Sequence, residues 1–209
     1  MTDNAQINFP PEFFARLDDT DDSDFYQLPR FVTHIDDKTI GALTAYYRET
    51  IFAGADVLDL MSSWISHLPD DLDLGRVSGL GLNTAELEAN PRLSDFVVHN
   101  LNSQPKLPYD DATYDFVLIA VSIQYLIRPL EVFKEIARVL RRPGQVIVAT
   151  SHRCFPTKAI RAFQQLNFEQ RLQFIGEYMR RTPHFSSPVV LDRSPVGADP
   201  LWLVNGQTI

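Results

Sequence analysis

Apolar residues along the chain follow two alternating patterns, one typical of helices and one typical of buried strands. Residues 38–53 place Ile40, Leu43, Tyr46 and Tyr47 at helical spacing before Gly54. The next block, VLDL at 57–60, is a short apolar run with a single acidic residue. Because helical spacing repeats every three to four residues and short apolar runs between turn residues favour strands, we predict a helix followed by a strand.

The same alternation continues through the centre of the chain. We predict strands near 77–82 and 95–99, with a short helix in TAELEAN between them. The run YDFVLIAVSI at 114–123 is long and β-branched, which favours a central strand covered on both faces. Residues 130–140 then form one apolar helical stripe, RRPG closes that helix, and QVIVAT follows as a parallel strand.

The last third of the chain predicts two helices and an antiparallel pair of strands. Pro156 would open the first helix, and Asn167 with Gln170 three residues later would start the second. The segments SSPVVLD and PLWLVNGQTI read as the strand pair. We therefore expect an α/β, doubly wound, Rossmann-like and mostly parallel sheet, with helices on both faces and an antiparallel C-terminal hairpin strand.

Length and composition favour one globular domain preceded by an arm. The 209 residues are 44% hydrophobic, enough for one substantial core. We expect residues 1–24 to form an N-terminal arm that is ordered only if it docks, and 25–209 to form a single domain. The acidic cluster DDTDDSD in the arm is expected to be solvated rather than to bind metal.

The charge and the rare residue types exclude several classes of partner. The net charge of −8 and a pI near 5.0 would repel nucleic acid and anionic membrane surfaces. Cys154 is the single cysteine, the start lacks a signal-peptide pattern, and no apolar run could span a bilayer, so we expect a cytoplasmic protein. The five histidines show no metal-ligand spacing, and we expect no metal.

Residues 107–150 carry a resemblance to a known family. The block LPYDDATYDFVLIAVSIQYLIRPLEVFKEIARVLRRPGQVIVAT resembles the class I S-adenosylmethionine-dependent methyltransferases of the type 11 group in its Leu-Pro, Phe-Asp, Arg-Val-Leu and Pro-Gly elements. Arg128 stands where that group usually has Asp. The resemblance extends over roughly residues 55–152 and implies S-adenosylmethionine as cofactor and a small molecule as methyl acceptor.

The cofactor motifs depart from the family pattern at three positions. After Asp59 the family has Gly-x-Gly-x-Gly, whereas this chain has Met61, Ser62, Ser63 and Trp64. Gly81 stands where the second strand usually ends in an acid that accepts hydrogen bonds from the ribose, so two charge-assisted bonds are lost unless Asn83, Glu86 or a water replaces them. Asn100 replaces an Asp near the adenine, and its carbonyl can still accept from an amine.

The changed turn can be understood as a rebuilt site or as a lost one. A non-glycine residue at positive φ costs on the order of 1–2 kcal/mol. In a rebuilt site, the serine hydroxyls would donate to the carboxylate of the cofactor. Trp64 would pad the sheet or contact the cofactor. Arg30, in the segment FYQLPRFVTHID, would bind that same carboxylate or pair with a nearby aspartate.

The resemblance implies a set of cofactor-binding and catalytic residues. Tyr125 and His152 are the catalytic candidates, although a packing role for Tyr125 and a solvated strand end at His152 remain alternatives. A catalytically inactive relative that acts as a binding or regulatory subunit is the competing function, and the oligomeric state is not indicated. The expected cofactor-binding residues are Tyr26, Arg30, His34, Asp59, Met61, Ser62, Ser63, Gly81, Leu82, Asn83, Asn100, Leu101 and Ser122.

Overall fold

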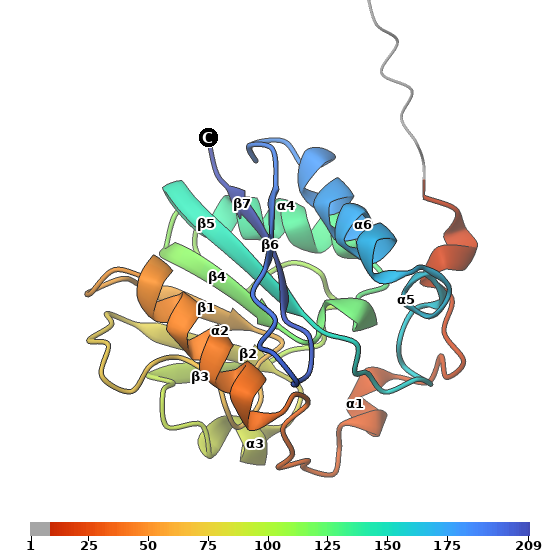
Figure 1. Ribbon diagram of the computed structural model, residues 1–209, viewed down its shortest axis with the longest axis horizontal. Coiled ribbons are helices and arrows are strands. Elements are labelled where there is room, and N and C mark those ends of the chain that lie inside the picture. The colour runs from red at the N-terminus through yellow and green to blue at the C-terminus, as the bar shows by residue number, and fades with distance from the viewer. Residues whose placement is uncertain (1–8) are drawn as a thin grey trace, which may run out of the picture.

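Seven strands form one sheet in the order β3-β2-β1-β4-β5-β7-β6 in a computed structural model that describes residues 9–209 (Figure 1). β1 to β5 are parallel, whereas β7 runs antiparallel to both β5 and β6. The predicted fold class is therefore confirmed. The strands are β1 (Val57–Leu60), β2 (Val77–Gly81), β3 (Asp95–Val98), β4 (Tyr114–Ala120), β5 (Leu140–Thr150), β6 (Val189–Asp192) and β7 (Trp202–Gln207).

Helices cover both faces of this sheet, and alternate strand residues supply the two cores. Leu58, Val117 and Val146 face the core that α4 and α6 complete. Val57, Leu118 and Ile147 face the core under α2. The helical elements are η1 (Pro11–Phe14), α1 (Asp22–Phe25), α2 (Asp37–Thr50), α3 (Thr84–Glu88), η2 (Ile123–Tyr125), α4 (Pro129–Val139), α5 (Arg161–Gln165) and α6 (Phe168–Arg180).

Three predicted boundaries are wrong, each because the chain makes a turn that the apolar pattern does not encode. β4 ends at Ala120, since Val121 adopts a φ of 49° and the chain leaves the sheet into η2. The RRPG segment lies within β5, where the register shifts against β4. No helix starts at Pro156, because the backbone there turns to bury Lys158, and α5 begins at Arg161.

Residues 16–34 form an N-terminal strap that crosses the carboxyl ends of the strands. Its centre is fixed by Lys158, whose amino group lies 3.2 Å from Asp18 Oδ2 and 3.4 Å from Asp22 Oδ1. Arg16 and Asn102 also bind Asp22, at 2.7 Å each. The prediction of a solvated acidic cluster is therefore wrong for Asp22, which is buried as the counterion of two cations.

The chain before the strap packs on the body of the protein through aromatic side chains. Phe9, Phe13 and Phe14 all lie against the ring of Phe174 in α6, with ring centroids 4.8–6.0 Å apart. The part of the predicted arm at residues 1–8 lies outside the described residues. From residue 9 onward, the arm contacts α6 and then continues into the strap.

The buried ion cluster predicts a large loss of stability when its lysine is removed. The side chain of Lys158 is only 1% exposed, and Asp22 beside it is 6% exposed. We expect Lys158→Ala to lower the free energy of unfolding by about 3 kcal/mol, because it leaves buried carboxylate charge less compensated. Urea denaturation measures this change.

Arg48→Ala is the control, because the Arg48–Asp71 pair is solvent-exposed and should contribute little. Equal effects of the two variants would contradict the structural role assigned to Lys158.

Candidate functional site

A cavity lies at the carboxyl edge of the sheet, between the loops that follow β1, β2, β3 and β4 and the strap above them. It opens to solvent, and the space within the cavity and its opening together amounts to about 1140 Å³. This is the edge at which open parallel sheets bind ligands. The residues predicted to bind a cofactor all line it: Tyr26, Arg30, His34, Asp59, Met61, Ser62, Ser63, Gly81, Leu82, Asn83, Asn100, Leu101 and Ser122.

The turn after β1 keeps a left-handed residue without using glycine. Met61 has a φ of 60°, which is uncommon for a side chain of this size. The backbone N–H of Ser62 then donates to Leu80 O at 2.8 Å, so the turn runs alongside β2. No helix lies between β1 and β2, both of which fall in the described part of the chain. His67, with a φ of 58°, is a second non-glycine residue in the left-handed region between β1 and β2.

The serine hydroxyls of this turn donate to protein carboxylates. Ser62 Oγ and Ser66 Oγ both donate to Asp59 Oδ2, at 2.5 and 2.6 Å, and Ser63 Oγ donates to Glu86 Oε2 at 2.6 Å. A hydroxyl has one hydrogen to donate, so these hydrogens are already engaged. The expectation that Ser62 and Ser63 donate to a cofactor carboxylate is not what the structure shows, because two buried acids compete for them.

The backbone of the turn also explains the glycine at the end of β2. A Cβ on Gly81 would lie 2.2 Å from the carbonyl oxygen of Ser62, so no larger residue fits without moving the turn. The next acid along the chain is Glu86, in the first turn of α3, whose side chain lines the cavity and is buried. Its Oε1 accepts the backbone N–H of Arg30 at 2.6 Å.

Asp59 is a fully buried carboxyl at the floor of the site. Burial raises its pKa from 3.8 to about 6, against the two serine hydrogen bonds that lower it. An acid held at such a cost in a cavity is typical of functional sites. No cation pairs with this carboxyl within the described residues, whose ion pairs lie elsewhere.

Arg30 points a cation at the cavity without an acidic partner. Its Nη1 donates to Phe25 O at 2.7 Å, and its guanidinium lies 4.2 Å from the centroid of the Phe25 ring. Of the two alternatives for Arg30, the ion pair with a neighbouring aspartate is absent from residues 9–209. A guanidinium with unused donors remains able to bind a carboxylate.

The loop after β1 and the end of β4 bring further polar atoms to the cavity wall. Ser122 Oγ and His67 Nδ1 line it as buried atoms without a hydrogen-bond partner in the described chain. Tyr125 accepts a hydrogen bond from the backbone N–H of Phe155 at 2.8 Å, and burial raises its pKa to about 12. Tyr125 is thus a neutral hydroxyl with a hydrogen left to donate.

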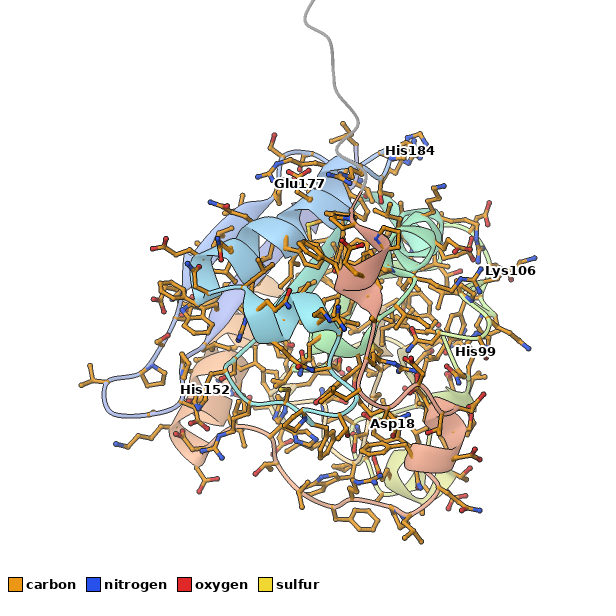
Figure 2. All side chains as sticks on the ribbon, turned by 90° about the vertical axis from the view of Figure 1, so that its right-hand side faces the viewer. Asp18, His99, Lys106, His152, Glu177 and His184 are labelled. Atoms are coloured by element: carbon orange, nitrogen blue, oxygen red, sulfur yellow. The ribbon has the colours of Figure 1, made fainter. Side chains whose placement is uncertain are left out.

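Two residues considered in the sequence, His152 and Trp64, do not line the cavity. The side chain of His152 is 52% exposed, with Nε2 3.6 Å from Asp199 Oδ1. Figure 2 shows it well apart from His99, which does line the cavity. Trp64 packs edge-on against Phe31 and donates its Nε1–H to Val32 O at 3.1 Å, so it holds the strap.

The sequence did not single out several residues that the fold brings to the cavity. Glu86 was predicted only as one possible replacement for the acid missing at Gly81, whereas nothing in the local pattern marked the others. Their positions depend on long-range contacts, as in the pairing of Lys158 with the strap. These residues are Asp22, His67, Glu86, His99, Asn102, Phe155 and Lys158.

Neither metal sites nor membrane segments are found in the part of the chain that the structure describes. No group of three or more His, Cys, Asp or Glu side chains there could hold a metal ion. No helix among residues 9–209 has the length and apolar character that crossing a membrane requires.

The fold and the position of the cavity define a class I methyltransferase architecture. Residues 68–148 match the family model "Methyltransferase domain". This match falls within residues 55–152, over which the sequence resembles the class I S-adenosylmethionine-dependent methyltransferases, and the fold agrees with that resemblance. No curated protein is significantly similar to this chain in sequence.

Solved structures with the same fold span most of the chain at low identity. The PH0226 protein from Pyrococcus horikoshii is 16% identical, with a TM-score of 0.62 over 89% of this chain and 99% of that one. Geranyl diphosphate C-methyltransferase from Streptomyces coelicolor, crystallised with Mg²⁺, geranyl diphosphate and S-adenosyl-L-homocysteine, is 13% identical, with a TM-score of 0.59 over 90% and 97%.

A third structure is a chain from the complex between the Haloferax volcanii Trm112 methyltransferase activator and a methyltransferase. It is 15% identical, with a TM-score of 0.60 over 82% of this chain and 90% of that one. At such identities these structures establish the fold but not the ligand, which depends on the residues of the site.

The buried acid at the floor of the cavity predicts a specific dependence of stability on pH. Its folded-state pKa of about 6 lies above the ordinary value of 3.8, so it favours the folded state below pH 4 and loses that contribution as pH rises through 6. We expect Asp59→Asn to be more stable than wild type above pH 7, by up to about 3 kcal/mol, and equally stable near pH 4.

Asparagine suits this test because both serines donate to the same oxygen of Asp59, which one amide carbonyl can replace. Urea unfolding between pH 4 and 8 measures the difference. Parallel pH profiles for the two proteins would show that Asp59 does not titrate in this range.

Proposed function

We propose that the protein binds S-adenosylmethionine in this cavity and transfers its methyl group to a small-molecule acceptor. The observation that carries the proposal is the convergence of all thirteen predicted cofactor residues, from four loops and the strap, on one cavity. These residues are distant in sequence, and the strap adds Tyr26, Arg30 and His34 to those that the strand ends bring to this edge of the sheet.

The polar groups around the cavity are complementary to the polar ends of such a cofactor. Arg30, which lacks an acidic partner in the described chain, would bind the amino acid carboxylate. Glu86 accepts only one hydrogen bond at each oxygen and would accept the ribose hydroxyls in place of an acid at residue 81. Asn100 and Leu101, after β3, would flank the adenine.

The reaction would take place beneath the strap. The bound cofactor would supply an electrophilic methyl group, and the chain would position the acceptor and exclude water. The strap is held over the cavity by hydrogen bonds from Asn83, Trp64 and Lys158 to its carbonyl oxygens. Tyr125 lies on the wall of the cavity. Of the two catalytic candidates, Tyr125 is thus the one next to the proposed site, and His152 would act only if the adjacent loop moved.

A catalytically inactive binding or regulatory subunit is the second candidate function. The observation that favours it is the turn after β1, where the serine donors are engaged by Asp59 and Glu86 and no helix follows before β2 in the described chain. A site of this kind could retain its shape without retaining affinity for a cofactor. Binding measurements separate the two functions.

The first test is calorimetric titration with S-adenosylhomocysteine, the product of the proposed reaction. We expect saturable binding to wild type and a loss of about tenfold or more in Arg30→Ala, because one charge-assisted contact is removed. Arg181→Ala is a matched control, since Arg181 also stacks on a phenylalanine, Phe9, but does not line the cavity. No heat at millimolar ligand would favour the inactive relative.

The second test asks whether Glu86 binds the ribose. Glu86→Gln should weaken S-adenosylhomocysteine by about tenfold, and it should have little effect on an analogue that lacks both ribose hydroxyls, because the lost contact is already missing there. Calorimetry of wild type and Glu86→Gln with both ligands gives the four affinities that this comparison needs. An equal loss for the two ligands would instead mean that Glu86 acts through Arg30 and Ser63 on the shape of the site.

A further inference from the structure

One wall of the cavity is made of aromatic rings arranged around Phe155. The ring centroid of His34 lies 5.0 Å from that of Phe155 at an interplanar angle of 86°, and Tyr125 is nearly stacked on it at 6.0 Å. Tyr26 lies edge-on to it at 6.4 Å. These four side chains all line the cavity, on the side formed by the strap and the ends of β4 and β5.

His34 is the residue in this wall with unused hydrogen-bonding capacity. Neither of its ring nitrogens has a hydrogen-bond partner among residues 9–209, and the ring is held in place by its edge-on contact with Phe155. A neutral imidazole offers one acceptor nitrogen and one N–H donor. His34 therefore lines the cavity with an acceptor nitrogen that is able to take a proton.

The charged and titratable groups around His34 favour a neutral resting state that can still become charged. Burial lowers the pKa of His34, and Arg30 lowers it further, whereas Glu86 opposes both. His67 is the other imidazole nearby, and burial lowers its pKa to about 4, so it stays neutral at physiological pH. A proton gained by His34 would be stabilised by the Glu86 carboxylate.

We propose that this wall binds a phenolic hydroxyl compound, and that His34 accepts the proton of its hydroxyl group. This rests on the proposed function, in which the phenol would be the methyl acceptor, and it assigns Tyr26 and His34 to the acceptor rather than to the cofactor. In the proton transfer, the O–H bond breaks, its electron pair stays on the phenol oxygen, and an N–H bond forms on the imidazole. The products are a phenolate and an imidazolium, which pair electrostatically in the cavity.

Two observations favour a phenol over other hydroxyl or amine acceptors. Faces and edges of four aromatic side chains bind a flat ring through offset or edge-on contacts, which an aliphatic alcohol cannot make. The guanidinium of Arg30 lies beside this wall, 5.4 Å from the Tyr26 centroid and 5.6 Å from that of Phe155. It would repel a protonated amine and attract a phenolate.

The test uses 4-nitrophenol, whose absorbance distinguishes phenol from phenolate, with protein saturated by S-adenosylhomocysteine and with protein alone. We expect saturable binding with the phenolate band enriched over free ligand at the same pH. His34→Gln should bind the phenol but lose at least tenfold of the bound phenolate signal. Phe155→Leu should weaken binding roughly three- to tenfold, and cyclohexanol should not compete.

His184→Asn is the control for loss of a histidine, because His184 is exposed and Figure 2 shows it at the far end of the molecule from Asp18 of the strap. Unchanged phenolate in His34→Gln, or equal binding of cyclohexanol, would overturn the proposal. Binding of 4-nitrophenol by a protein that does not bind S-adenosylhomocysteine would overturn the proposed function and leave the phenol subsite standing.

Discussion

The buried carboxylate of Glu86 joins the two segments that close the cavity. One oxygen accepts the Ser63 hydroxyl from the turn after β1, and the other accepts the backbone N–H of Arg30 from the strap. Asn83 fixes the helix that carries Glu86 by accepting its backbone N–H, and binds the strap through Tyr26 O. The position of the strap, and with it Arg30 and His34, therefore depends on this short helix after β2.

The turn after β1 replaces glycine by different means at each position. Met61 tolerates a left-handed conformation, the Ser62 carbonyl fills the space next to Gly81, and Ser63 bonds to Glu86. The acid expected at the end of β2 is excluded by that carbonyl, and Glu86 stands one helical turn further along. The departures at the turn and at the end of β2 are thus one linked change, which favours a rebuilt site over a decayed one.

The sequence predicted the fold and many of the residues that line the cavity, for a physical reason. Apolar periodicity encodes which face of each strand and helix is buried, so β1 to β4, α2 and the capping box of α6 were predictable. The residues proposed to bind the cofactor could be placed around one cavity because they lie at or just beyond strand ends, which meet at one edge of a parallel sheet. Asp59, Gly81, Asn100 and Ser122 illustrate this rule.

Residues brought in by long-range contacts were not predictable in this way. Lys158 reaches the site because a turn buries it beneath the strap, and Asp22 becomes its counterion although the acidic run around it looks solvated. His152 follows β5 as expected, yet its side chain turns toward Asp199 and solvent. Local pattern specifies where a strand ends, whereas the direction of the side chains beyond it depends on partners far away in the sequence.

The most direct test of the account is a crystal structure of the protein with S-adenosylhomocysteine. The account predicts ligand density in the cavity beneath the strap, with the carboxylate on Arg30, the ribose hydroxyls on Glu86 and the adenine beside Leu101. Density that places the ribose away from Glu86 would contradict the rebuilt site. An unchanged cavity without ligand, at concentrations that saturate related methyltransferases, would contradict the proposed function itself.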